Sequence, residues 1–109
     1  MDESHIEAGC KEVAVRFGGR MYKTTWPSRR GGPDDILVLP FMPVVFVELK
    51  TYEGRQSPIQ KIWEQDLVGM GQRYWLVRSI ESFEIRVREF VAYERGRMVE
   101  CSPREKRPR

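Results

Sequence analysis

The sequence predicts an α/β domain in which a mixed β-sheet is flanked by helices, in the order helix, three strands, helix, strand, helix. Three features carry this prediction. Apolar residues recur at helical spacing near the N-terminus, two aliphatic runs (residues 36–39 and 44–47) are separated by two prolines, and a strand, helix, strand passage follows. A hairpin is antiparallel whereas strands joined through a helix run parallel, so the sheet is expected to be mixed.

The first helix is predicted from a stripe of apolar residues that ends at Gly18 and Gly19. This stripe consists of Ile6, Cys10, Val13 and Phe17. Residues 21–26 then read as the first strand. Lys23 in this strand is expected either to approach a functional face or to remain a surface lysine with a buried aliphatic stem.

The two aliphatic runs predict a hairpin. Pro40 and Pro43 cannot lie inside a central strand, so both are assigned to the turn. With a period of two, Glu48 and Lys50 point to the same face of the second strand. A three-residue turn places Asp34 opposite Glu48, with their Cβ atoms about 4.5–5.5 Å apart. A slip of one residue places Asp35 there instead, and the sequence leaves both registers open.

The second half of the chain predicts a helix, a strand and a last helix. Ser57, Pro58 and Gln60 have the spacing of a helix cap, and glycine at 69 or 71 ends that helix. Its buried face is expected to contain Ile59, Ile62, Trp63, Leu67 and Met70. Residues 74–78 form the fourth strand. The last helix starts near Ser79, with Ile80, Phe83, Val87, Phe90 and Val91 toward the core.

Composition fits one small domain. The chain has 109 residues, 40% hydrophobic and 32% charged, and no apolar stretch reaches the roughly 20 residues that a transmembrane helix needs. The acidic, polar N-terminus is not that of a signal peptide, and Cys10 and Cys101 have neither disulfide-framework nor metal-site spacing, so a reducing cytoplasm is expected. Of the net charge of +3, residues 95–109 carry +4. We therefore predict a domain over residues 1–94 and a basic, flexible tail over residues 95–109.

The polar residues at the edges of the hairpin suggest a metal site. Mg²⁺ takes one or two carboxylates and keeps several waters, so a converging Asp and Glu suffice. Lys50 adds a positive charge beside them. Taken alone, residues of these types at this spacing are more often a turn after Gly-Pro and an exposed ion pair at a strand end than a metal site. Basic residues precede Asp34 without an intervening acid and offer a rim for phosphates: Arg16, Arg20, Lys23, Arg29 and Arg30.

An ordered set of motifs carries a resemblance to a known family. The chain contains Glu7, Gly18-Gly19, Lys23, Gly31-Gly32-Pro33-Asp34, Val47-Glu48-Leu49-Lys50 and Pro58-Ile59-Gln60 in this order. This pattern resembles the PD-(D/E)xK nuclease superfamily and, within it, the VRR-NUC (virus-type replication-repair nuclease) branch, over residues 3–85. It departs from the branch at Gly32, where an apolar residue is more frequent, and at Asp35, where a basic or small residue is more usual.

The resemblance implies a restriction-endonuclease-like fold and a Mg²⁺- or Mn²⁺-dependent DNA endonuclease. It implies Asp34, Glu48 and the backbone carbonyl of Leu49 as metal ligands, and Lys50 as the group that positions water or stabilises charge. Glu7 and Gln60 would support them, although Glu7 is also explained by the helix dipole and Gln60 by the cap. Lys23, Arg29, Arg30 and Arg20 are the expected DNA contacts.

Small stand-alone members of this branch resemble homodimeric Holliday-junction resolvases from phages. The resemblance therefore implies branched DNA as substrate, a homodimer, and a host-cell cytoplasm as location. Two alternatives remain: a monomeric flap or nicking nuclease, and a non-catalytic DNA-binding module with structural carboxylates.

Overall fold

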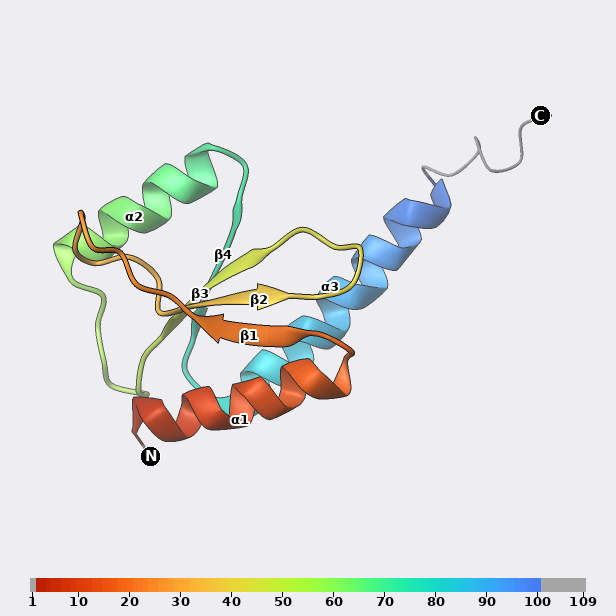
Figure 1. Cartoon of the computed structure of the whole chain (residues 1–109), viewed down its shortest axis with the longest axis horizontal. Coiled ribbons are helices and arrows are strands. Elements are labelled where there is room, and N and C mark those ends of the chain that lie inside the picture. Colours follow the sequence, from red (N-terminus) through yellow and green to blue (C-terminus); the bar gives the residue numbers. More distant parts are fainter. Residues whose placement is uncertain (1, 101–109) are drawn as a thin grey trace.

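The computed structural model describes residues 2–100 (Figure 1). Its elements are α1 (Glu3–Arg16), β1 (Arg20–Lys23), β2 (Asp35–Val38), β3 (Val45–Leu49), α2 (Pro58–Gly69), β4 (Arg73–Val77) and α3 (Ile80–Glu100). The predicted α/β class and the predicted order of elements are confirmed.

One four-stranded sheet forms the centre of the molecule, with strand order β1-β2-β3-β4. β1 pairs with β2 and β2 with β3 in antiparallel fashion, whereas β3 and β4 are parallel. Helix α2 makes the connection from β3 to β4. In Figure 1, α1 lies below the sheet and α2 above it. The sheet is therefore mixed and flanked by helices, as the hairpin and the strand, helix, strand passage predicted.

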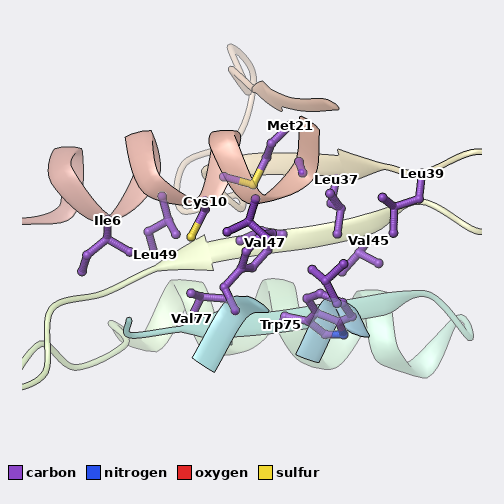
Figure 2. Packing of buried hydrophobic residues seen from close by; sticks show 14 of the residues in the cluster. Ile6, Cys10, Met21, Leu37, Leu39, Val45, Val47, Leu49, Trp75 and Val77 are labelled. Carbon is purple, nitrogen blue, oxygen red and sulfur yellow. The ribbon is translucent and has the colours of Figure 1, made fainter. Parts of the chain in front are cut away.

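The hydrophobic core lies between the sheet and the pair α1 and α3 (Figure 2). Alternate residues of the strands point into it, because side chains of a strand alternate between the two faces. The core consists of Ile6, Cys10, Val13, Ala14, Met21, Leu37, Leu39, Val45, Val47, Leu49, Trp75, Val77, Phe83, Val87 and Val91. The apolar stripes predicted for the first and last helices are therefore largely buried.

The register of the β2–β3 hairpin decides between the two aspartates. Asp35 pairs with Val47, and the next pair in the same register sets Asp34 opposite Glu48. The structure therefore has the three-residue turn. The alternative register, in which Asp35 would lie opposite Glu48, does not occur. Phe41 occupies the tip of this turn with φ 62° and 94% exposure.

The first strand is shorter than the predicted residues 21–26. After β1, the indole Nε1 of Trp26 donates a hydrogen bond to the Pro33 carbonyl at 2.9 Å, and the Thr24 hydroxyl donates to the same oxygen at 2.7 Å. Together with the backbone N–H of Thr24, which donates to the Asp34 carbonyl at 2.9 Å, these side-chain bonds hold the end of the loop that leads into Asp34.

The predicted buried face of α2 is wrong in part. Trp63 is buried and Leu67 is half-buried, but Ile59, Ile62 and Met70 are 40%, 46% and 67% exposed. The helix packs mainly against β4, an edge strand, so the sheet covers a narrower stripe than the sequence pattern suggests.

Helix α3 runs six residues past the boundary predicted at residue 94. Glu94 is 5% exposed and forms ion pairs with Arg73 of β4 at 3.2 Å and with Arg97 at 3.5 Å, which tie this part of the helix to the sheet. The remainder of the predicted tail, residues 101–109, lies outside the described residues. Within residues 2–100 no helix has the length and apolarity required to cross a membrane.

Candidate active site

The ends of β2 and β3 meet the N-terminal part of α1 at a small cavity. Its volume is about 120 Å³, and its wall is formed by Glu3, Ser4, Glu7, Lys23, Asp34 and Leu49. Four of the sequence motifs, represented by Glu7, Lys23, Asp34 and Leu49 and separated by up to 42 positions along the chain, therefore come together at one edge of the sheet.

Asp34 lies at the bend just before β2. Its Oδ2 atom accepts a hydrogen bond from the backbone N–H of Leu49 at 2.7 Å. This bond fixes the Asp34 carboxylate against the end of β3, beside the peptide that follows Glu48. The hairpin register and this hydrogen bond together determine where the carboxylate lies.

Glu48 is fully buried in β3, with 0% exposure. Its Oε1 atom accepts hydrogen bonds from the Tyr74 hydroxyl and from Nε2 of Gln56, the latter at 3.4 Å. Its Oε2 atom is buried and has no hydrogen-bond partner among residues 2–100. Burial raises the pKa of Glu48, and the bonds from Tyr74 and Gln56 act in the opposite direction.

Lys50 follows on the same face of the chain as Glu48, and its charge opposes the rise in the pKa of Glu48. Its backbone N–H donates to the carbonyl of Val77 at 3.0 Å, so this residue is still anchored to β4. The loop beyond it is held by Arg78, whose Nη1 atom donates to the carbonyls of Thr51 at 2.8 Å and of Gly54 at 2.5 Å. Both sides of Lys50 are therefore fixed.

Glu7 and Lys23 reach the cavity from α1 and β1. The Lys23 ammonium lies 3.5 Å from Oε1 of Glu7, and the Glu7 side chain is 14% exposed. Oε2 of Glu7 is buried without a hydrogen-bond partner among the described residues. The structure thus sets both residues beside Asp34, where the resemblance expected them.

Asp35 points to the opposite side of the sheet, into the core next to Glu7. It is 0% exposed, and neither of its carboxylate oxygens has a donor in the described part of the chain. Burial, followed by the hydrogen bond with Glu7, raises the pKa of Asp35 to about 8. The same hydrogen bond lowers the pKa of Glu7. The pair is satisfied when Asp35 carries a proton and donates it to Glu7.

Gln60 forms the helix cap that its spacing allowed. Its Oε1 atom accepts from the Ser57 N–H at 2.8 Å, and its own N–H donates to Oγ of Ser57 at 3.2 Å. The side-chain carbonyl oxygen of Gln60 is therefore engaged in capping the start of α2.

Three residues around Glu48 were missed by the sequence analysis. Besides Gln56 and Tyr74, Glu64 of α2 takes part, because its Oε1 atom accepts from Nε2 of Gln56 at 2.9 Å. Glu64 lies one helical turn after Gln60, which is a signal for a shared face. Tyr74 gave no such signal, since its contact with Glu48 requires that β4 lies beside β3.

The four predicted DNA contacts do not form one surface. Lys23 lies at the cavity. Arg29 forms an ion pair with Asp66 at 3.0 Å and lies 4.6 Å above the ring of Trp63, and Arg30 accepts a hydrogen bond from that indole through its carbonyl. Arg20 lies at the other end of β1, opposite Val38.

The oxygen atoms of this site are of the kind that binds a divalent cation. Mg²⁺ and Mn²⁺ prefer oxygen ligands, and Mg²⁺ needs only one or two carboxylates because it keeps several waters. The Asp34 charge adds to the rise in the pKa of Glu48, a repulsion that a cation would relieve. Within residues 2–100 no three His, Cys, Asp or Glu side chains converge as a metal site. Two carboxylates, an unpartnered buried oxygen and the backbone of Leu49 fit an ion of this type.

Comparisons with known proteins concern the fold and the family of the chain. No model of a known protein family matches the chain. A protein named "Putative nuclease p44", from the Acyrthosiphon pisum secondary endosymbiont phage 1, is 32% identical over 77 residues, which are 71% of this chain and 83% of that protein. A solved structure described as "VRR_NUC domain" has a TM-score of 0.75 at 24% identity and covers 81% of this chain and 96% of its own. Another, "VRR_NUC domain protein", has a TM-score of 0.69 at 15% identity and covers 84% and 89%. At these identities the two structures establish likeness of fold.

Proposed function

The chain belongs to the VRR-NUC family of nucleases, and from this membership we propose that it is a DNA endonuclease that hydrolyses phosphodiester bonds with Mg²⁺ or Mn²⁺. The observation that carries the proposal is the position of Asp34, opposite Glu48 in the hairpin register and hydrogen-bonded to Leu49. In metal-dependent cleavage of a phosphodiester, carboxylates hold the cation, and a nearby lysine can stabilise the charge that develops on the phosphate oxygens.

In this proposal Asp34, Glu48 and the carbonyl oxygen of Leu49 hold the cation. When bound, the ion polarises the scissile phosphate and lowers the pKa of a water. Tyr74 and Gln56 occupy Oε1 of Glu48, which leaves Oε2 as the oxygen without a partner in the described structure. The two donors thereby orient the carboxylate, as outer partners of metal ligands do.

Lys50 and Glu7 act beside the cation. The Lys50 ammonium is a compact charge that orients water or stabilises the charge developing on the phosphate oxygens. Glu7 adds a carboxylate to the wall of the cavity, and its ion pair with Lys23 holds that lysine beside it. Gln60 has its amide NH₂ group left for a phosphate or a water, because its carbonyl oxygen serves the cap.

Branched DNA is the substrate class we propose, with two copies of the chain acting on one four-way junction. Two equivalent cuts require two equivalent sites, and a two-fold homodimer provides them. A monomer with a single site is suited to a flap or a nick instead, so the oligomeric state and the substrate are linked.

The test compares a synthetic four-way junction, a flap and a linear duplex, each with Mg²⁺, Mn²⁺ or EDTA. Asp34→Ala, Glu48→Ala and Lys50→Ala are expected to reduce cleavage by about 100-fold or more, since loss of even an outer partner of a metal ligand costs about 10–100-fold. Glu89→Ala is the matched control, because Glu89 is an exposed carboxylate on α3.

Cleavage that survives Asp34→Ala and Glu48→Ala would overturn the site. Paired symmetric nicks confined to the junction support the resolvase activity, whereas a preference for the flap favours the monomeric nuclease. DNA binding that is independent of Mg²⁺ and gives no product would favour the non-catalytic module.

A further inference from the structure

A second cavity lies at the end of β4, next to the candidate active site. Its volume is about 450 Å³, and its wall is formed by the end of β4, by Tyr52 in the loop after Lys50 and by the first two turns of α3. Val77, which belongs to this wall, pairs with Leu49, which belongs to the wall of the active-site cavity. The two cavities therefore adjoin neighbouring strands, whose backbones are about 4.8 Å apart.

The charged groups in this wall are all positive. Arg78 and Arg86 line the cavity, and neither forms an ion pair with a carboxylate within residues 2–100. The acid in the first turn of α3, Glu81, does not line the cavity, and its charge instead raises the pKa of the Cys10 thiol on α1. Two guanidinium groups without a carboxylate partner favour an anionic ligand, and phosphate matches their geometry.

Both guanidinium groups are held in place by the protein itself. Nη1 of Arg78 donates to three carbonyl oxygens in the loop of residues 51–54, which orders the loop that carries Tyr52. The Arg86 guanidinium lies 5.2 Å from the centre of the Trp75 ring. Stacking uses the face of a guanidinium plane and leaves its N–H groups for an acceptor. Little side-chain ordering is therefore required when a phosphate binds.

The rest of the wall is suited to a nucleobase. Leu76 and Val77 contribute apolar surface, and the Tyr52 side chain is 81% exposed. The volume is larger than an inorganic phosphate requires and lies within the range of small-molecule sites, roughly 300–1,000 Å³. Proteins that bind single-stranded nucleic acid combine these same features, because cations hold the backbone and aromatic rings stack on the bases. The cavity therefore matches a nucleotide.

We propose that this cavity binds one unpaired nucleotide of the DNA substrate, with its phosphate at Arg78 and Arg86 and its base against the Tyr52 ring. The inference rests on the proposed nuclease function and names a feature of its substrate. A base inside a duplex is stacked and paired, so it does not reach a side chain of this kind. A four-way junction or a flap exposes nucleotides at its branch, whereas an unbroken duplex does not. Because the cavity adjoins the active site, the cut then falls close to the branch.

The test measures binding of a short fluorescent single strand to the full chain by fluorescence anisotropy, in EDTA so that no DNA is cut. Arg86→Ala and Tyr52→Ala are each expected to raise the dissociation constant by about 10-fold, and Tyr52→Phe, which keeps the ring, should bind like wild type. Arg86→Ala should also lower the slope of log affinity against log salt by about 0.7, the value for one phosphate contact on a single strand. A blunt duplex should be affected less by Tyr52→Ala.

Arg88→Ala is the matched control, because Arg88 is an exposed arginine of the same helix that forms an ion pair with Glu84 and does not line the cavity. It should leave the salt slope unchanged. Tyr52→Ala changes an exposed loop residue, and it decides the question if Arg86→Ala does not fold.

Wild-type binding of the strand by Arg86→Ala and Tyr52→Ala, or an equal loss in Arg88→Ala, would overturn the nucleotide site. A loss confined to one of the two folded variants would also overturn it, since phosphate and base belong to one nucleotide. The nuclease proposal fails separately. A wild type that binds the strand through Arg86 and Tyr52 but cuts no DNA keeps the cavity and removes the hydrolysis, whereas cleavage that requires Asp34 and is unchanged in both variants removes the cavity alone.

Discussion

Replacing Tyr74 by phenylalanine removes the hydroxyl that donates to the Glu48 carboxylate, and the structure indicates how large the effect should be. Tyr74 is 7% exposed and donates to Oε1 of Glu48, whose other donor, Nε2 of Gln56, is at the long distance of 3.4 Å. A hydrogen bond to a charged group contributes about 1.5–3 kcal/mol. We therefore expect Tyr74→Phe to weaken Mn²⁺ binding by about 10–100-fold, the range found for outer partners of metal ligands.

The pKa of Glu48 leads to the same expectation of weaker Mn²⁺ binding. Burial raises the pKa of Glu48, and the Tyr74 hydrogen bond is the largest effect that lowers it. Without that bond a proton competes more strongly with the cation for the Glu48 carboxylate, so the loss of Mn²⁺ affinity should be greater at pH 6 than at pH 8.

The assay is a titration of free Mn²⁺ by electron paramagnetic resonance, without DNA, followed by the KM for DNA. Tyr93→Phe is the matched control, because Tyr93 is 62% exposed on α3. A folded Tyr74→Phe protein with the Mn²⁺ affinity of wild type would refute the argument that this hydroxyl orients Glu48. A change in the KM for DNA with unchanged Mn²⁺ binding would assign Tyr74 to the DNA contact instead.

Two further predictions concern the neighbouring residues. Asp35 has a folded-state pKa of about 8, above its ordinary value, so its contribution to stability is complete at low pH and is lost as the pH rises toward and through 8. In EDTA, Asp35→Asn should abolish this part of the pH dependence in urea unfolding and should be more stable than wild type at pH 9; an unchanged slope would contradict it. Gln60→Ala should cost about 1 kcal/mol through loss of the cap with Ser57, whereas Gln60→Glu keeps a capping box. If Gln60→Glu retains stability and full nuclease activity, the amide has no role beyond the cap.

The hairpin was the part of the fold that the sequence predicted best. Pro40 and Pro43 restrict where the turn lies, and the strand period then fixes the faces of Glu48 and Lys50. The last choice, between Asp34 and Asp35, depended on the number of residues in the turn, which local sequence does not determine. The observed pairing of Asp35 with Val47 supplied it.

Residues whose neighbours come from distant elements were predicted less well. The contact between Tyr74 and Glu48 depends on β4 lying beside β3, a non-local pairing. The helical spacing of apolar residues on α2 predicted a buried face. The spacing does not show which element covers that face, and Ile59 and Ile62 are in fact exposed. Arg20 and Lys23 are close in sequence, yet a strand separates them by about 10 Å, and they lie at opposite ends of β1.

Because Asp34 and Asp35 are adjacent in the sequence, the number of residues in the distant turn decides which of the two carboxylates faces the candidate site. Asp34 serves the candidate site and Asp35 is buried against Glu7, and alternation along the strand alone distinguishes them. An insertion or deletion of one residue in the tip around Phe41, which begins about 17 Å along the strand from Asp34, would exchange the two carboxylates without altering either codon. Natural changes in the length of this tip should accordingly come in steps of two residues.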